Sequence, residues 1–420
     1  MEDGDGKIDK PTPLIANNIE KNEIKVLNEI KDENEIKDEN EIKDENEIKE
    51  DELDDLQIDA KELEFNDQPE IKITKAEELQ KIEKDSEKIE IDKLSDDLTV
   101  EAVLDILKKV PFTKLELLSI NKLDISSLDF LNNENFKSLI VLEIKNSKLT
   151  SLDKLNECPF KELKVLDLSS NEISSINSLA QCPFKNLEIL NLADNKKIKE
   201  LKPIANGEFK KLRKLDLSSN LIDNENLNYL GDLSLSNLES LYLNDNKISD
   251  ISVLSQTTFK SLKDLQINNN EIEKIDAFKT DDRFKNLEEL QLCGNKIASI
   301  EALSAIQSDK LKILRLSKNE IENIDKLNSA TFKNLEVLDL FDNKIKNIDV
   351  FGNTPFNATI KELDLSYNSL ESIDVLVEKK NFPNLNNLKI EVNPIFEKKN
   401  DKIKELFDNY KIEYSFTPMF

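Results

Sequence analysis

The amino-acid sequence predicts an α/β solenoid, a curved array of about twelve stacked units with a parallel β-sheet on its concave side. The first observation is a period, because a leucine, or once an isoleucine, begins a similar unit every 24 to 26 residues from Leu115 to Leu385. The second is the spacing within a unit, as in Leu335-Glu-Val-Leu338-Asp-Leu340, where apolar residues alternate with polar ones. The third is an asparagine three residues after this pair. Such a period over most of a chain excludes a closed globular domain.

Each unit is predicted to begin with a short strand. In an extended chain Leu166 and Leu168 point to one side, and Val165 and Asp167 point to the other. One unit cannot bury its own leucines, so we expect neighbouring strands to stack about 4.8 Å apart and the leucines to form continuous rows. The asparagine is expected to bond backbone groups that a tight turn leaves unpaired. It recurs at Asn171, Asn195, Asn220, Asn246, Asn270, Asn295, Asn319, Asn343, Asn368 and Asn393.

A phenylalanine marks the return side of the units. It lies three residues before the next starting leucine, and because an aromatic ring buries a large area we expect a stacked spine under the convex side rather than a cofactor site. The positions are Phe136, Phe160, Phe184, Phe209, Phe259, Phe284, Phe332 and Phe382.

The segment before the units, residues 1–96, is predicted to be disordered, acidic and of low complexity. Residues 22–51 repeat hexads of the type Asn-Glu-Ile-Lys-Asp-Glu. On a helix this period carries the isoleucines around the surface, so they cannot form a core. Two interpretations stay open: the segment is a tail that binds basic proteins such as histones, or it is a spacer without a specific partner.

Caps are expected at both ends of the units, which span residues 115–392. A helix within residues 97–114, capped by Thr99, should cover the first unit, because the terminal rows would otherwise face water. Residues 393–420 should form a C-terminal cap with a helix from Asp401 to Tyr410 and a strand-like stretch after it. The side chains expected to cover the last unit are Phe396, Ile403, Leu406 and Phe407.

Charge and composition limit the functions. Of the net charge of −27, residues 1–100 contribute −20, from 35 acidic and 15 basic side chains. This balance argues against binding to nucleic acid or to an anionic membrane surface. The chain contains no histidine, the commonest general base and metal ligand, so we expect neither catalysis nor a cofactor. No signal peptide or membrane span is visible, and we expect a monomer inside the cell, in the cytoplasm or the nucleus.

Cys158 and Cys182 occupy equivalent places in adjacent units, so a disulfide between them is geometrically conceivable. We favour two small buried side chains in a reducing compartment.

The motif Leu-x-x-Leu-x-Leu-x-x-Asn-x-Ile-x-x-Ile-x-x-Leu, seen from Leu163 to Leu179 and from Leu238 to Leu254, resembles the leucine-rich repeat superfamily. Its second half is most similar to the subgroup of the nuclear regulatory subunit of protein phosphatase 1 and the acidic leucine-rich nuclear phosphoproteins. The resemblance implies a solenoid that binds proteins and, as an alternative, a regulatory subunit of a Ser/Thr protein phosphatase.

The concave face is where we expect a partner protein. Its central row reads Ser119, Glu143, Asp167, Asn191, Asp216, Tyr242, Gln266, Gln291, Arg315, Asp339, Asp364 and Lys389. Aromatic residues and arginine anchor protein interfaces, so they select two candidate patches. The first consists of Arg315, Asp339, Phe341, Asp364 and Tyr367, and the second of Asp167, Asp216 and Tyr242. The alternative is a solvated face without a partner. Asp339 and Asp364 could in principle act as an acid–base pair, but on an open face we predict a non-catalytic scaffold.

Overall fold

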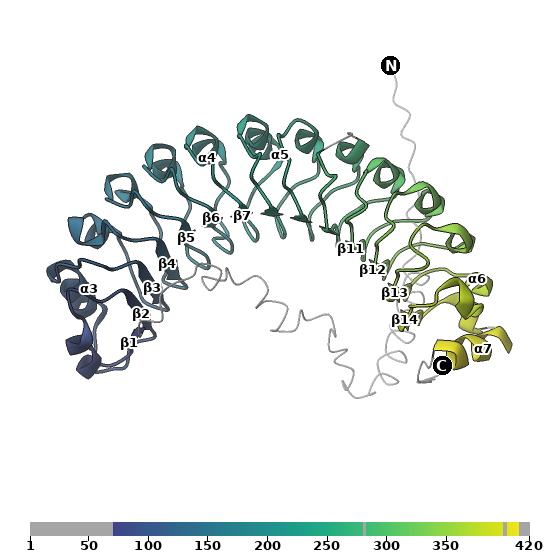
Figure 1. The fold of residues 1–420 in the computed structure, drawn as a ribbon, viewed down its shortest axis with the longest axis horizontal. Coiled ribbons are helices and arrows are strands. Elements are labelled where there is room, and N and C mark those ends of the chain that lie inside the picture. Colours follow the sequence, from purple (N-terminus) through teal and green to yellow (C-terminus); the bar gives the residue numbers. More distant parts are fainter. Residues whose placement is uncertain (1–69, 280–282, 398–400, 411–420) are drawn as a thin grey trace, which may run out of the picture. The chain divides into compact units, whose positions relative to one another are not determined.

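The predicted solenoid is present in the computed structural model, which describes residues 70–279, 283–397 and 401–410. In the compact unit from Ala60 to Phe420, a single parallel sheet has 14 strands that follow one another in chain order. The strands line the inner side of this unit and the helical turns its outer side (Figure 1). The strands are β1 (Ile71–Ile73), β2 (Lys88–Asp92), β3 (Leu117–Asn121), β4 (Val141–Lys145), β5 (Val165–Asp167), β6 (Ile189–Asn191), β7 (Lys214–Asp216), β8 (Ser240–Tyr242), β9 (Asp264–Gln266), β10 (Glu289–Gln291), β11 (Ile313–Arg315), β12 (Val337–Asp339), β13 (Glu362–Asp364) and β14 (Asn387–Lys389).

The outer side consists of short helices, most of them single 3₁₀ turns. The α-helices are α3 (Val100–Lys109), α4 (Lys202–Asn206), α5 (Asn224–Leu227), α6 (Asp374–Val377) and α7 (Asp401–Tyr410). The 3₁₀ helices are η2 (Ala76–Lys81), η3 (Asp129–Leu131), η4 (Glu134–Phe136), η5 (Leu155–Glu157), η6 (Asn177–Gln181), η7 (Asn228–Asp232), η8 (Ser252–Ser255), η9 (Asp276–Lys279), η10 (Glu301–Ala305), η11 (Asp325–Ser329), η12 (Asp349–Asn353), η13 (Lys379–Asn381) and η14 (Pro394–Glu397).

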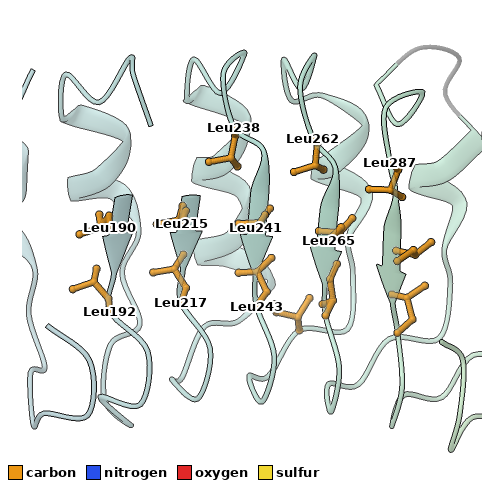
Figure 2. Close-up of a cluster of buried hydrophobic side chains, with 14 of the residues drawn as sticks. Leu190, Leu192, Leu215, Leu217, Leu238, Leu241, Leu243, Leu262, Leu265 and Leu287 are labelled. Carbon is orange, nitrogen blue, oxygen red and sulfur yellow. The ribbon is translucent and has the colours of Figure 1, made fainter. Parts of the chain in front are cut away.

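The strand register confirms the predicted leucine rows. Leu215 lies opposite Leu241, Leu241 opposite Leu265, and the row continues from Ile71 on β1 to Leu388 on β14. Figure 2 shows part of this row, together with a second row two residues later along each strand. Every member of the first row except Ile71 is at most 4% exposed. The solenoid therefore has one continuous apolar core.

The asparagines lie inside the turns, as predicted. Asn319 is typical: its Nδ2 donates to the carbonyls of Leu292, Leu316 and Ser317, and its Oδ1 accepts from the N–H of Ile297 at 3.0 Å. Each side chain thus joins two neighbouring coils. Asn220 differs, because its Oδ1 has no hydrogen-bond partner among the described residues. The preceding unit has an extra residue between its asparagine and the next isoleucine, which displaces the usual donor.

The phenylalanine spine is confirmed in its burial, whereas its predicted stacking is found only locally. All eight side chains are at most 5% exposed, and the rings of Phe160 and Phe184 stack with centroids 6.1 Å apart and planes 22° apart. Neighbouring rings elsewhere are tilted, as between Phe259 and Phe284. The spine therefore fills the space between the sheet and the outer turns by packing rather than by regular stacking.

The predicted start of the ordered array is wrong. β1 and β2 lie within residues 1–96 and join the sheet through the pairs Ile71–Ile89 and Ile91–Ile120. The helix expected to close the array does form as α3, and Thr99 caps it by accepting from the N–H of Ala102 at 3.2 Å. However, α3 connects β2 to β3 instead of closing the array. The first two coils escaped detection because they use isoleucine in place of leucine and are embedded in alternating charges.

The C-terminal cap is confirmed in its helical part. Ile403, Leu406 and Tyr410 of α7 are at most 6% exposed, and Phe396 is partly buried against the core. The hexads, the strand-like stretch after residue 410 and the side chain of Phe407 lie outside the described residues.

Candidate interaction surface

The central row of the concave face is aligned as the sequence predicts. Asp216 is the partner of Tyr242 across neighbouring strands, Arg315 of Asp339, and Asp339 of Asp364. Each strand therefore contributes one side chain to a row that runs along the whole sheet, and residues far apart in the sequence become neighbours. The first two strands extend this row with Lys72 and Glu90.

The structure brings the five residues of the first predicted patch together on β11 to β13 and the turns that follow. The rings of Phe341 and Tyr367 touch, with centroids 5.0 Å apart and planes 56° apart. The N–H of Phe341 donates to Oδ1 of Asp339 at 3.0 Å, which ties the aromatic pair to the central row. Arg315, on the adjacent strand, makes no side-chain hydrogen bond or ion pair within the described parts of the chain. Its guanidinium group is therefore available to a ligand.

One carboxylate of this patch, that of Asp364, differs from an ordinary surface acid. Burial raises the pKa of Asp364, and the negative charge of Asp339 acts in the same direction. The N–H of Ser366, which donates to Asp364 at 2.9 Å, and Lys389, whose Nζ is 3.8 Å from Asp364, oppose this rise. A cation from a partner would therefore relieve repulsion between Asp339 and Asp364.

Two exposed side chains with strained backbone angles lie at this end of the face: Tyr367, which belongs to the aromatic pair, and Val392, its equivalent in the next coil. Tyr367 is 48% exposed and Val392 is 39% exposed, the two exposed large hydrophobic side chains of the described residues. Both precede a buried asparagine and have positive φ angles of 55° and 52°. The other coils place a polar residue or glycine there: Lys122, Asn146, Ser170, Asp194, Ser219, Asp245, Asn269, Gly294, Lys318 and Asp342. A β-branched residue rarely adopts this conformation, and such strain concentrates at functional sites.

Apolar side chains also flank the charged row on its other side. Ile313 and Val337, each one residue before a buried leucine, are half-buried partners on β11 and β12. Sequence reasoning missed them and Val392, although an apolar residue at a position that is polar in most other units is a usable signal. We name the whole group the C-terminal patch; it consists of Ile313, Arg315, Val337, Asp339, Phe341, Asp364, Tyr367 and Val392.

The second predicted patch is mostly buried. Asp167, Asp216 and Tyr242 are 3%, 4% and 5% exposed. The hydroxyl of Tyr242 donates to Asp264 at 2.6 Å, and Nζ of Lys214 lies 5.0 Å from the centre of its ring. The polar atoms of these residues therefore already have hydrogen-bond partners within the concave face. Binding of a partner to these three residues stays a prediction.

The two aspartates of this second patch each close a turn. Asp167 accepts a hydrogen bond from the N–H of Ser169, and Asp216 accepts one from Ser218, both at 2.9 Å. Burial raises the pKa of Asp167 to about 6, although the positive charge of Lys145 opposes the rise. These carboxylates therefore stabilise the backbone turns that follow their strands.

Other candidate sites carry little chemistry. Cys158 and Cys182 are free and buried, and burial raises the pKa of both thiols to about 12, so they are poor nucleophiles. Within residues 70–279, 283–397 and 401–410, no group of three or more acidic, cysteine or histidine side chains could hold a metal ion. The helices in the same ranges are all too short or too polar to cross a membrane.

Comparison with protein families supports the fold. A family model for leucine-rich repeats in two copies matches residues 161–206, 236–280 and 260–305, and a second leucine-rich repeat model matches residues 285–345. A comparison with curated proteins finds no match.

Solved structures give the same result. An internalin from Listeria monocytogenes is 24% identical, with a TM-score of 0.61, over 79% of this chain and 86% of the internalin. A leucine-rich repeat protein from Leptospira interrogans is 21% identical, with a TM-score of 0.51, over 76% of this chain and 88% of that protein. A TDR receptor is 18% identical, with a TM-score of 0.53, over 76% of this chain and 56% of the receptor. At these identities the likeness shows the fold alone.

Proposed function

We propose, from the premise that this chain is a leucine-rich repeat protein, that it is a non-catalytic scaffold whose C-terminal patch binds a partner protein. Solenoids of this type present extended concave surfaces to their ligands. The observation that carries the proposal is the exposure of Tyr367 and Val392 in a strained backbone conformation beside Phe341. The exposed parts of these apolar side chains add nothing to folding, whereas a partner that covers them gains from their burial.

The patch has the composition of an interface centre. Phe341 and Tyr367 offer a large apolar area with few rotatable bonds, and Arg315 offers a fork of donors to a carboxylate. Because the strands hold these groups in register, little conformational freedom is lost on binding. The matching partner surface carries an apolar anchor for the aromatic pair, an acidic group for Arg315 and a basic group for Asp339 and Asp364.

Affinity capture from a lysate of the source cells tests the proposal. The baits are the full-length chain and a variant with Arg315, Phe341 and Tyr367 changed to alanine. We expect the variant to bind its main partner at least about tenfold more weakly, as loss of interface anchors does. A control variant with Arg213 and Tyr229 changed to alanine removes an arginine and a tyrosine outside the patch and should bind normally.

The outcomes separate the alternatives. Equal capture by all three baits contradicts the proposal. Capture that fades steeply with salt in every bait assigns binding to the acidic N-terminal segment, because exposed charges are screened. If the captured protein is the catalytic subunit of a Ser/Thr phosphatase, the chain is a regulator of that enzyme.

Val392 supplies a second prediction that needs no partner. Its replacement by asparagine, which tolerates positive φ and occupies this position as Asn269 in another coil, should raise the free energy of unfolding by roughly 1 kcal/mol. Urea unfolding measures this change. The same variant should bind the partner more weakly, because the exposed apolar side chain is lost.

The reverse substitution is the control. Asn269→Val should lower the free energy of unfolding by a similar amount and leave capture unchanged, since β9 and its turn lie outside the patch. If Val392→Asn destabilises the chain, the valine is needed for packing and is not a strained residue kept for binding.

A further inference from the structure

The two ends of the solenoid differ. At the C-terminal end, α7 covers the last coil with Ile403 and Leu406, which are 6% and 0% exposed. At the other end β1 is the first strand of the sheet, and none of the described residues forms a strand on its outer side. Ile71 and Leu79 of this coil are only partly buried. Open sheet edges of this kind recruit other strands.

The hydrogen-bond pattern of the other coils shows which backbone groups of β1 point outward. In each unit the residue before the buried leucine donates its N–H to the preceding coil, as Val165 does to Ile140 at 3.1 Å. The central residue accepts from the preceding coil, as Asn191 does from Leu168 at 2.9 Å. The corresponding residues of the first coil are Glu70 and Lys72. Their backbone groups therefore point away from β2, to a side on which the described residues provide no partner.

The charges on the sheet show how strands select their neighbours. One row of charged side chains lies two residues before the leucines of the first buried row, and its charge changes sign from each coil to the next. Over nine successive units this row reads Lys164, Glu188, Arg213, Glu239, Lys263, Glu288, Lys312, Glu336 and Lys361. Ion pairs within this row include Arg213 with Glu239 at 2.8 Å and Lys361 with Glu336 at 2.7 Å. At the free end, Nζ of Lys72 is 2.8 Å from Glu90 on the next strand. Opposite charges on adjacent coils therefore accompany correct stacking along this row, and the Lys72–Glu90 pair repeats the arrangement at the free end.

We propose that β1 is a docking edge for a second copy of this chain, which pairs its own β1 antiparallel about a two-fold axis at Ile71. Glu70 then lies opposite Lys72 of the second copy, and Lys72 lies opposite Glu70 of that copy. Both residues have outward backbone groups, so each such pair exchanges two hydrogen bonds. Ile71 meets Ile71 of the second copy on the core side and extends the apolar row across the axis.

Charge complementarity selects the antiparallel arrangement. In this arrangement positive and negative side chains alternate across the two-fold axis. The order is Lys88 and Glu70 of one copy, followed by Lys72 and Glu90 of the second copy. Parallel pairing would set Glu70 against Glu70 and Lys72 against Lys72. An isolated lysine at an edge would discourage association, but the Glu-Ile-Lys triplet is complementary to itself when reversed. Because the strand has three residues, the dimer is weak, reversible and sensitive to salt.

Sedimentation equilibrium of the full-length chain over a range of concentrations tests the proposal. We expect a monomer–dimer equilibrium that shifts to the monomer at high salt. Glu70→Lys and Lys72→Glu should each abolish the dimer, because each places like charges opposite one another. A mixture of the two variants should form a mixed dimer, which shows that both are folded. Lys389→Glu, a charge reversal in the same row at the opposite end of the sheet, should dimerise normally.

Three outcomes would overturn the proposal. The first is a monomer at every concentration, which means that β1 is covered or unused. The second is a dimer that both edge variants retain, which moves the contact elsewhere. The third is association that survives in the edge variants and disappears when residues 22–51 are deleted. That segment carries five further Glu-Ile-Lys triplets, and this result would make the hexads the associating element.

Discussion

Asn319→Ala is expected to lower the free energy of unfolding by about 2–4 kcal/mol, because it leaves several buried backbone groups without partners. The Asn319 side chain is 8% exposed and bonds groups of two coils. Its Nδ2 lies 2.9 Å from the carbonyl oxygen of Leu292, and its Oδ1 lies 3.0 Å from the N–H of Ile297. Alanine is too small to replace these bonds, and the turn is too tightly packed for water to reach both groups. Urea or thermal unfolding of the full-length chain measures the loss.

The control is Asn334→Ala. Asn334 is also an asparagine that joins two coils, because its Nδ2 donates to the carbonyl of Asp309, but this hydrogen bond is exposed to solvent. Water can satisfy the groups that it leaves, so the change should be within about 0.5 kcal/mol. Similar losses of unfolding free energy in both variants would mean that the hydrogen bonds of the buried asparagine stabilise the chain no more than exposed ones do.

The periodic parts of the fold could be predicted from the sequence. Leucine spacing fixes which residues face the core, and stacking then brings equivalent residues of adjacent units together without long-range information. For this reason the central row, including Arg315, Asp339 and Asp364, was placed correctly. A pattern of this kind converts directly into contacts, since each coil meets only its neighbours.

Features that depend on exceptions to the period were harder to predict. β1 and β2 were missed because Ile71 and Ile89 stand among charged residues that resemble the acidic hexads before them. The burial of Tyr242 was missed because its bond to Asp264 comes from a different row of the face. Val392 differs in residue type from the polar residues at this position in other coils, but the positive φ that makes a valine unusual there is visible only in the structure.

The pH dependence of stability gives the second large effect. Burial raises the pKa of Asp167 to about 6 in the folded chain, above the value of about 3.9 for an aspartate in an unfolded chain. Between these values the folded state binds the extra proton, so the contribution of Asp167 to stability becomes more favourable as the pH falls from 7 to 4. At pH 7 the charged form is correspondingly unfavourable. Asp167→Asn should therefore raise the free energy of unfolding at pH 7 by about 1–3 kcal/mol and change it little at pH 4.

Asparagine is a suitable replacement because the next coil already uses it. Asn191 accepts from the N–H of Ala193 at 3.0 Å, the same bond that Asp167 makes to Ser169. Urea unfolding at both pH values isolates the effect, since other acids titrate equally in both proteins. Asp124→Asn, which removes an exposed carboxylate 2.9 Å from Nζ of Lys148, is the control and should not raise the free energy of unfolding at pH 7. An equal change at both pH values for Asp167→Asn would mean that Lys145 already neutralises the buried carboxylate. If Asp167→Asn is stabilising and still captures the partner, Asp167 does not bind that partner, and contact is confined to other residues such as the C-terminal patch.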